Sequence, residues 1–197
     1  MKTDNLELKN NSEYNGRIFS GLDLSEHKVS DAEFEGCAFK KCTLTKASLG
    51  GCRFIDCSFE DCDLSLVKMR KARLRNVGFR DSKLIGINWA ELDCAYSMKF
   101  EKCLLNYSIF SGLDLRGIQM LECSIHEADF SDCNISNAVF THTDFLGTRF
   151  SNTNLKLADF SKATRYRINP LNNKIGKAKF SLPEAVGLLS GLDIEII

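Results

Sequence analysis

Nine cysteines are the most reactive side chains in this 197-residue sequence. Cys37, Cys42, Cys52, Cys57 and Cys62 follow one another at steps of five or ten residues. Four residues between successive cysteines fall within the range found in zinc sites. However, eight of the nine stand at a position that elsewhere in the chain holds Ala, Ser or Thr. This exchange favours small core residues over metal ligands, because free cysteine packs as a small apolar side chain. We therefore expect no metal.

Two further properties of the cysteines follow from their positions. Only Cys94 lies outside the pattern, so we expect it alone to be reachable by solvent. An odd number of cysteines without an apolar leader argues against a disulfide framework. Some pairs twenty residues apart nevertheless remain geometrically open to a disulfide, namely Cys37/Cys57, Cys42/Cys62 and Cys103/Cys123.

Histidines and carboxylates give little support for catalysis. The three histidines are His27, His126 and His142, and none belongs to a Ser-His-Asp arrangement. We find no glycine-rich phosphate loop and no paired carboxylates placed for acid–base work. A hexapeptide-repeat acyltransferase would need a period of six, whereas this chain repeats every five residues. The sequence predicts a protein that is not an enzyme and needs no cofactor.

Composition sets broad limits on partners and location. Lys plus Arg equals Asp plus Glu, 26 each, so net charge favours neither direct nucleic-acid binding nor a membrane surface. No stretch approaches 18 consecutive apolar residues, and the start MKTDNLELKNNSEYNG lacks the apolar run of a signal peptide. We expect a cytoplasmic protein.

A five-residue period must position all of these side chains. Stepping by five from Phe19 to Trp89 gives fifteen large apolar residues, and stepping from Phe100 to Phe160 gives thirteen more. Two positions before these centres, 19 of the 28 residues are Ala, Cys, Ser or Thr, and the residue between is commonly polar. In–out–in alternation over three residues indicates a short strand, and the other two residues must turn the chain. An α-helix would spread this stripe around its whole surface.

A second period indicates how the coil closes. Phe19, Phe39, Phe59 and Phe79 recur every twenty residues, which suggests four five-residue sides per turn with like side chains stacked between turns. Twenty-eight repeats give seven turns of an all-β solenoid. Because each turn is buried only by its neighbours, the ends need caps.

The repeat resembles that of the pentapeptide-repeat family. The triplets that carry the resemblance are Cys62-Asp63-Leu64, Ala128-Asp129-Phe130 and Thr153-Asn154-Leu155, which match the family's A(D/N)LXX consensus. The resemblance covers about 140 residues. It implies a right-handed, four-sided β-helix.

The frame divides the chain into five parts. We expect an N-terminal cap over 1–18, repeats over 19–91, a break over 92–97, repeats over 98–165 and a C-terminal module over 166–197. Six extra residues at the break predict a small surface loop, and loops on rigid scaffolds often carry function. Its residues are Leu92, Asp93, Cys94, Ala95, Tyr96 and Ser97.

The C-terminal module predicts a cap and a dimer contact. Ser181-Leu182-Pro183-Glu184 has the pattern of a capping box that opens a short helix, and Gly191 would end it. The following LDIEII alternates like an edge strand, which a second copy could pair by two-fold symmetry. The expected interface residues are Leu188, Leu189, Leu192, Ile194 and Ile196.

This terminus also resembles one branch of the family, the proteins that protect DNA gyrase from quinolones or albicidin. CDLSLVKM, GINW and KFSLPEAVGLLSGLDIEI are most similar to albicidin-resistance members. The resemblance implies a homodimeric rod that mimics DNA and docks on the DNA-binding saddle of the gyrase A subunit, with the break as a projecting loop. The carboxylates of the acidic stretch would make the contact, namely Asp114, Glu122, Glu127, Asp129, Asp132, Asp144 and Asp159.

A basic stretch supports an alternative. Between 68 and 83 the sequence carries seven cations against Asp81 alone. A structural scaffold could use this basic band to hold a different protein partner. Its members are Lys68, Arg70, Lys71, Arg73, Arg75, Arg80 and Lys83.

Overall fold

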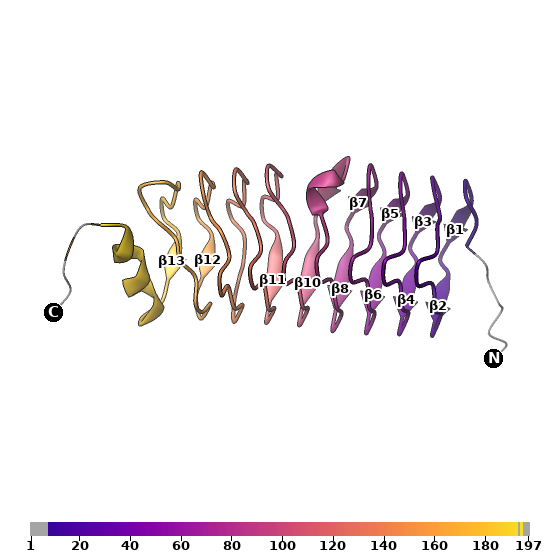
Figure 1. Cartoon of the computed structure of the whole chain (residues 1–197), viewed down its shortest axis with the longest axis horizontal. Helices are drawn as coiled ribbons and strands as arrows, with labels where there is room; N and C mark the ends of the chain where they lie inside the picture. The colour runs from indigo at the N-terminus through magenta and orange to yellow at the C-terminus, as the bar shows by residue number, and fades with distance from the viewer. Residues whose placement is uncertain (1–7, 193, 195–197) are drawn as a thin grey trace.

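The chain winds along a single axis into a rod, with its two ends at opposite tips (Figure 1). The computed structural model describes residues 8–192 and 194. Successive turns pair in parallel with an offset of twenty residues, as between Phe19 and Phe39 and between Phe39 and Phe59. This offset confirms the solenoid and its twenty-residue turn.

Two sides of the rod carry regular strands. The first, side A, has the order β1-β3-β5-β7-β9. Its strands are β1 (Glu13–Asn15), β3 (Glu33–Glu35), β5 (Arg53–Ile55), β7 (Arg73–Arg75) and β9 (Cys94–Tyr96). Side B has the order β11-β10-β8-β6-β4-β2 and, nearer the C-terminus, a separate β12-β13 pair. Its strands are β2 (Ile18–Ser20), β4 (Ala38–Lys40), β6 (Ser58–Glu60), β8 (Gly78–Arg80), β10 (Lys99–Glu101), β11 (Gln119–Leu121), β12 (Asp159–Phe160) and β13 (Lys179–Phe180).

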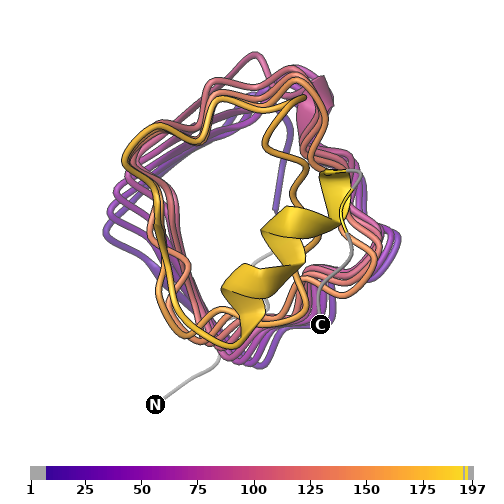
Figure 2. The ribbon, with the colours of Figure 1, turned by 90° about the vertical axis from the view of Figure 1, so that its left-hand side faces the viewer.

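The other two sides pair through single bridges. Asp23 pairs with Thr43 on side C, and Lys28 pairs with Ser48 on side D. With sides A and B, these give four pairing columns per turn at five-residue intervals, as the sequence predicted. Viewed along its axis, the chain traces a closed outline (Figure 2).

Stacked apolar side chains fill the interior. The ring centroids of Phe19 and Phe39 are 4.7 Å apart, and those of Phe39 and Phe59 are 4.6 Å apart. Phe79 and Phe100 continue this column at 5.0 Å. Offset stacking of this kind adds about 0.5–1.5 kcal/mol per pair beyond the apolar burial. The core is therefore one continuous ladder of side chains along the axis.

The corners explain why Asp or Asn precedes so many centres. Asp63 accepts a hydrogen bond from the backbone N–H of Ser65 at 3.0 Å, and Asp159 accepts one from Ser161 at 2.9 Å. Such Asx turns guide the chain round the corner. The next residue commonly has a positive φ, as Leu66 does at 59°. The D/N of the repeat is thus a turn-forming residue.

The solenoid extends beyond both expected boundaries. Strand β1 lies within the cap expected over 1–18, and Tyr14 stacks on Phe34 at 5.0 Å. Strand β13 lies within the module expected over 166–197 and pairs with β12. Seven turns is therefore too few, because degenerate repeats still supply backbone partners even where the centre residues depart from the pattern.

The C-terminal cap is a 3-10 helix, η2 (Glu184–Gly191), which crosses the end of the rod (Figure 2). The expected capping box is wrong, because Pro183 precedes the helix without a side-chain cap. The Ser181 hydroxyl instead accepts a hydrogen bond from the backbone N–H of Lys162. The helix ends at Gly191, as the sequence predicted, and Leu192 is its C-cap residue. Ile196 lies outside the described residues.

Candidate functional sites on the solenoid wall

The cysteines behave as core residues. Eight are buried and Cys94 is half-buried. This confirms the prediction that Cys94 alone lies outside the core positions. All nine are free thiols. Within residues 8–192 and 194, no group of three or more His, Cys, Asp or Glu side chains is arranged to hold a metal ion.

Many of their thiols donate hydrogen bonds to backbone carbonyl groups inside the wall. The Cys57 thiol donates to the carbonyl of Phe34 at 3.3 Å, and the Thr143 hydroxyl, at an equivalent position, donates to that of Met120 at 2.7 Å. This shared hydrogen bond explains why Cys, Ser and Thr interchange. Burial raises the pKa of Cys57 and that of Cys133 to about 11, so these thiols are poor nucleophiles.

The break between the two frames is not the projecting loop predicted over 92–97. A 3-10 helix, η1 (Trp89–Glu91), replaces the corner, and Cys94–Tyr96 form strand β9. Strand β9 pairs with β7 with Arg73 opposite Cys94, an offset of 21. The insertion is therefore one residue and not six, because Cys94–Tyr96 pair with β7 and remain part of the wall.

Side A opens immediately after this insertion. Strand β9 ends the five-stranded sheet, and the next residue on side A, Asp114, pairs only with Asn134. In the next turn, which is regular, the backbone N–H of Leu115 donates to the carbonyl of Asn134, and that of Gly117 donates to the carbonyl of Ser136. For Ala95 and Ser97, which stand at the equivalent places, the described part of the chain provides no such partner.

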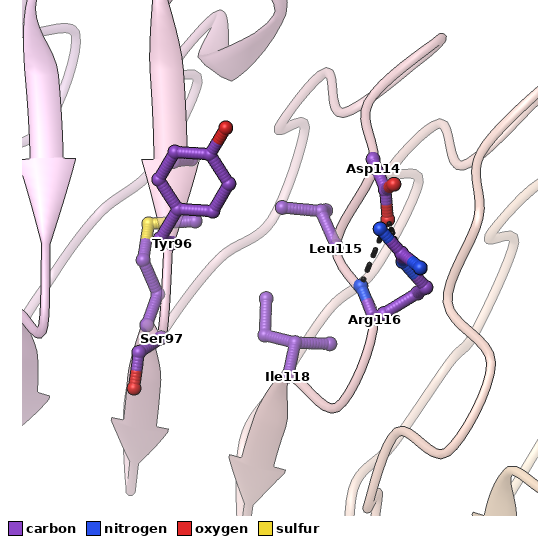
Figure 3. A pocket seen from close by; sticks show the side chains of 8 residues that line it. Tyr96, Ser97, Asp114, Leu115, Arg116 and Ile118 are labelled. Atoms are coloured by element: carbon purple, nitrogen blue, oxygen red, sulfur yellow. Dashed lines mark hydrogen bonds and ion pairs between the residues drawn. The ribbon is translucent and has the colours of Figure 1, made fainter.

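A cavity of about 310 Å³ lies in this opening (Figure 3). Each regular turn places a large side chain in the side A column, such as Leu74 or Leu115, but here Ala95 occupies that place. The cavity is thus the space of a missing core side chain at a gap in the ladder. Its lining comes from two adjoining turns, Ala95, Tyr96, Ser97 and Met98 in one and Asp114, Leu115, Arg116 and Ile118 in the other.

Sequence reasoning selected Ala95, Tyr96 and Ser97 only as loop residues and missed the apolar floor. The available signal was the small residue 21 positions after Leu74, in a column otherwise filled by large ones. Leu115 and Ile118 look like ordinary repeat residues in the sequence. Only the interrupted pairing turns them into the wall of a cavity.

The seven expected carboxylates do not form one face. Asp114, Asp144 and Asp159 lie on sides A, C and B, and Asp129 lies on side D. Glu122, Glu127 and Asp132 lie at corners with positive φ. The acidic stretch therefore encircles the rod, because successive five-residue repeats face successive sides.

The four side carboxylates have structural partners. Asp114 pairs with Arg116 at 2.9 Å, Asp129 with Arg149 at 4.0 Å and Asp159 with Lys179 at 3.4 Å. Asp144 contacts Arg165 and also His126, the latter at 2.9 Å. Each of the four also accepts an Asx-turn hydrogen bond from a nearby backbone N–H. Their charges are thus largely compensated.

The three corner carboxylates are less constrained. Asp132 accepts a hydrogen bond from the amide of Asn152 at 2.7 Å. Glu122 and Glu127 have no ion pair within the portion that the structure describes. These three side chains carry most of the uncompensated negative charge of the acidic stretch.

The basic band also winds around the rod, but part of it is concentrated near side A. Arg73 lies on β7 and is paired with Asp93 at 2.6 Å. Arg70 and Lys71 occupy the turn before this strand, and Arg75 is its last residue. None of the three has an ion pair among residues 8–192 and 194. They form a local cationic patch.

The C-terminal end exposes apolar side chains. Leu189 and Leu192 are 39% and 37% exposed, and Ile194 is 55% exposed. Leu182 and Val186 add further exposed apolar surface, whereas Leu188 packs partly against the core. The expected interface residues that the structure describes are therefore at or near one apolar tip.

The repeated strand–turn unit and the filled interior define a β-solenoid. Two family models match in sequence. The model for a pentapeptide repeat region covers residues 32–110, and that for pentapeptide repeats covers 99–137 and 133–164. The chain belongs to the pentapeptide-repeat family.

Solved structures include several similar folds at low identity. HetL, a protein involved in heterocyst differentiation regulation from the cyanobacterium Nostoc sp. strain PCC 7120, is 15% identical, with 86% of this chain and 85% of HetL covered and a TM-score of 0.48. A trypsin-treated form of QnrB1, a plasmid-mediated fluoroquinolone-resistance protein, is 19% identical, with 98% and 100% covered and a TM-score of 0.44. No curated protein matches. No helix in the described part of the chain is long and apolar enough to cross a bilayer.

Proposed function

We propose that this protein acts by binding, not by catalysis, and that it protects DNA gyrase from inhibitors such as albicidin or fluoroquinolones. The exposed apolar tip formed by Val186, Leu189, Leu192 and Ile194 is the observation that carries the proposal. Apolar side chains gathered at one end favour burial against a second copy. The C-terminal resemblance to gyrase-protecting proteins supports the same arrangement.

Dimerisation through this tip would place the two acidic stretches on either side of a two-fold axis. Glu122, Glu127 and Asp132 would then supply most of the negative charge offered to the DNA-binding saddle of the gyrase A subunit. Because the whole chain has no net charge, the mimicry of DNA would be local.

A supercoiling assay with purified gyrase tests the proposal. Gyrase is inhibited with albicidin or a fluoroquinolone and then titrated with this protein. We expect supercoiling to recover, and the triple variant Glu122→Gln, Glu127→Gln, Asp132→Asn to need more protein for the same recovery. Val186→Asp should lower the sedimentation mass from dimer to monomer.

The matched control is Arg70→Gln, Lys71→Gln, Arg75→Gln, which removes charge from the cationic patch without touching the acidic stretch. Protection should survive this change. If supercoiling stays blocked with both drugs and the protein binds no gyrase A subunit, the proposal is wrong.

The cationic patch supports the second candidate, a scaffold for another protein. Arg70, Lys71 and Arg75 are charged and lack ion pairs in the described chain. Arg70 and Lys71 lie in the turn before β7, and Arg75 is the last residue of that strand on side A. An acidic partner is the class that such a patch selects. The control variant should then lose capture of that partner while gyrase remains unaffected.

A further inference from the structure

We propose that the opening on side A binds an extended peptide, which completes the interrupted ladder by strand addition. This inference does not depend on the gyrase proposal. It rests on three observations at the frame slip: free backbone groups, an apolar cavity and access from solvent.

The backbone groups specify the ligand class. In the regular ladder, Ala95 and Ser97 would donate to the carbonyls of Asp114 and Arg116, and the N–H of Asp114 would donate to Asp93. None of these bonds occurs within the residues that the structure describes. Donors and acceptors therefore alternate along both borders of the opening. Strand addition is the recognition mode that satisfies such a row of main-chain groups.

The cavity specifies the side chain. Ala95 leaves the interior column unfilled, and Met98, Leu115 and Ile118 provide apolar walls. A volume of about 310 Å³ is at the lower end of ligand pockets. One large apolar side chain would enter this space, and its adjoining backbone would lie in the opening between the two turns. Because strand residues alternate between faces, its two neighbours on the peptide would point to solvent.

The border of the cavity is open. Tyr96 is 65% exposed, and the Asp114–Arg116 ion pair lies on the opposite border (Figure 3). The aromatic ring offers an apolar contact to the outward side of the peptide, and the ion pair offers polar ones. The expected ligand is thus a short extended segment with polar flanks around one leucine, isoleucine, valine, phenylalanine or methionine.

Fluorescence anisotropy with labelled peptides of about seven residues tests this inference. The probes have blocked ends, threonines at the outward positions and one of those five apolar residues at the centre. We expect saturable binding of at least one probe. Ala95→Leu, which fills the cavity from within, should weaken this binding at least about tenfold. Ala90→Leu, at an exposed position of η1, should not.

A second probe separates strand pairing from simple apolar contact. N-methylation of the peptide amides beside the central residue removes main-chain donors and leaves the side chain intact. We expect this methylated probe to bind at least about tenfold more weakly than the unmethylated peptide, a loss similar to that caused by Ala95→Leu. Hydrogen exchange should also show the amides of Ala95 and Ser97 slowed by the unmethylated peptide.

Three results would overturn the proposal: no saturable binding by any probe, equal binding to Ala95→Leu and the wild type, or full affinity of the methylated probe. Sedimentation without peptide distinguishes a further occupant. If Ala95→Leu alone lowers the mass from a larger assembly, a second copy of this chain fills the opening and no peptide ligand is needed.

Discussion

Sides A and B meet the same one-residue insertion and respond differently. On side B the ladder continues from β8 to β10 with Gly78 opposite Lys99, and Phe79 still stacks on Phe100 at 5.0 Å. On side A pairing continues only as far as β9 and then stops. Both sides belong to the same turn of the rod, so the difference is local.

The position of the insertion accounts for this difference. The extra residue enters after side D, where η1 replaces a regular corner and Trp89 occupies the core against Phe110 at 5.7 Å. Side A is the first side to follow it, and Ala95 cannot fill the interior there. The disturbance stays local, because pairing on side A resumes at an offset of twenty between Asp114 and Asn134 and continues to Asn154.

Removing a core ring from the intact side should have the largest effect. Phe100 is fully buried between Phe79 and Trp89, so Phe100→Ala should lower the free energy of unfolding by about 3–5 kcal/mol. Tyr96→Ala, on the exposed border of the opening, should change it by no more than about 0.5 kcal/mol. Urea denaturation followed by circular dichroism measures both.

Equal losses in these two variants would contradict the comparison. They would mean that the open side contributes to cooperative unfolding as much as the closed one. An intact m-value in each variant is the check that both still unfold as one unit.

Filling the opening should have the next largest effect. Ala95→Leu supplies the missing column residue and should raise the free energy of unfolding by about 0.5–2 kcal/mol. Ala138→Leu makes the same change at a fully buried small position and should lower it by about 1–3 kcal/mol. Thermal melts of the two variants measure these changes. If both substitutions lower the melting temperature, the cavity on side A cannot accommodate a leucine side chain.

The fold was predictable because each of its causes repeats. A large residue such as Phe59 at every fifth place fixes the turn, and a small one such as Cys57 two places earlier fixes the side that faces inward. The opening was not predictable in this way, because it depends on a hydrogen bond that Ala95 does not make. The prediction that the acidic residues act together failed for a related reason. A run such as 127–132 is contiguous in sequence, but the chain turns a corner within it, so its side chains face different sides of the rod.

Thiol reactivity should distinguish the open side from the rest of the wall. Only Cys94 of the nine cysteines is partly exposed, so a chromogenic disulfide reagent should modify one thiol per native chain in the fast phase. The other thiols should react only on unfolding, because their burial keeps the reagent out. Desolvation also raises the pKa of Cys52, Cys57 and Cys133, which lowers their thiolate fraction.

Cys94→Ser should abolish that fast phase and lower the total titrated in denaturant from nine thiols to eight. Several fast thiols in the native protein would show that the wall opens elsewhere as well. Peptide bound at the side A opening should slow the reaction of Cys94, which links this measurement to strand addition.

The smallest effect should come from a charge on the closed side. Hydrogen bonds from Ser161, with Lys179 at 3.4 Å, lower the pKa of Asp159 below its ordinary value of 3.8. The unfolded chain therefore binds the proton more readily than the folded one. The stabilisation from this carboxylate is present above pH 3.8 and is lost as the pH falls through the lower, folded-state pKa.

Asp159→Asn isolates that charge, because the amide oxygen can still accept the Asx-turn hydrogen bond from the backbone of Ser161. We expect the variant to show a flatter decline of unfolding free energy below pH 3.8 than the wild type, with a small difference because the ion pair is solvent-screened. Urea midpoints measured across that range give the comparison. Parallel declines would mean that Lys179 and Ser161 hold the carboxyl equally well in both protonation states, and that pairing of β12 with β13 depends on the backbone alone.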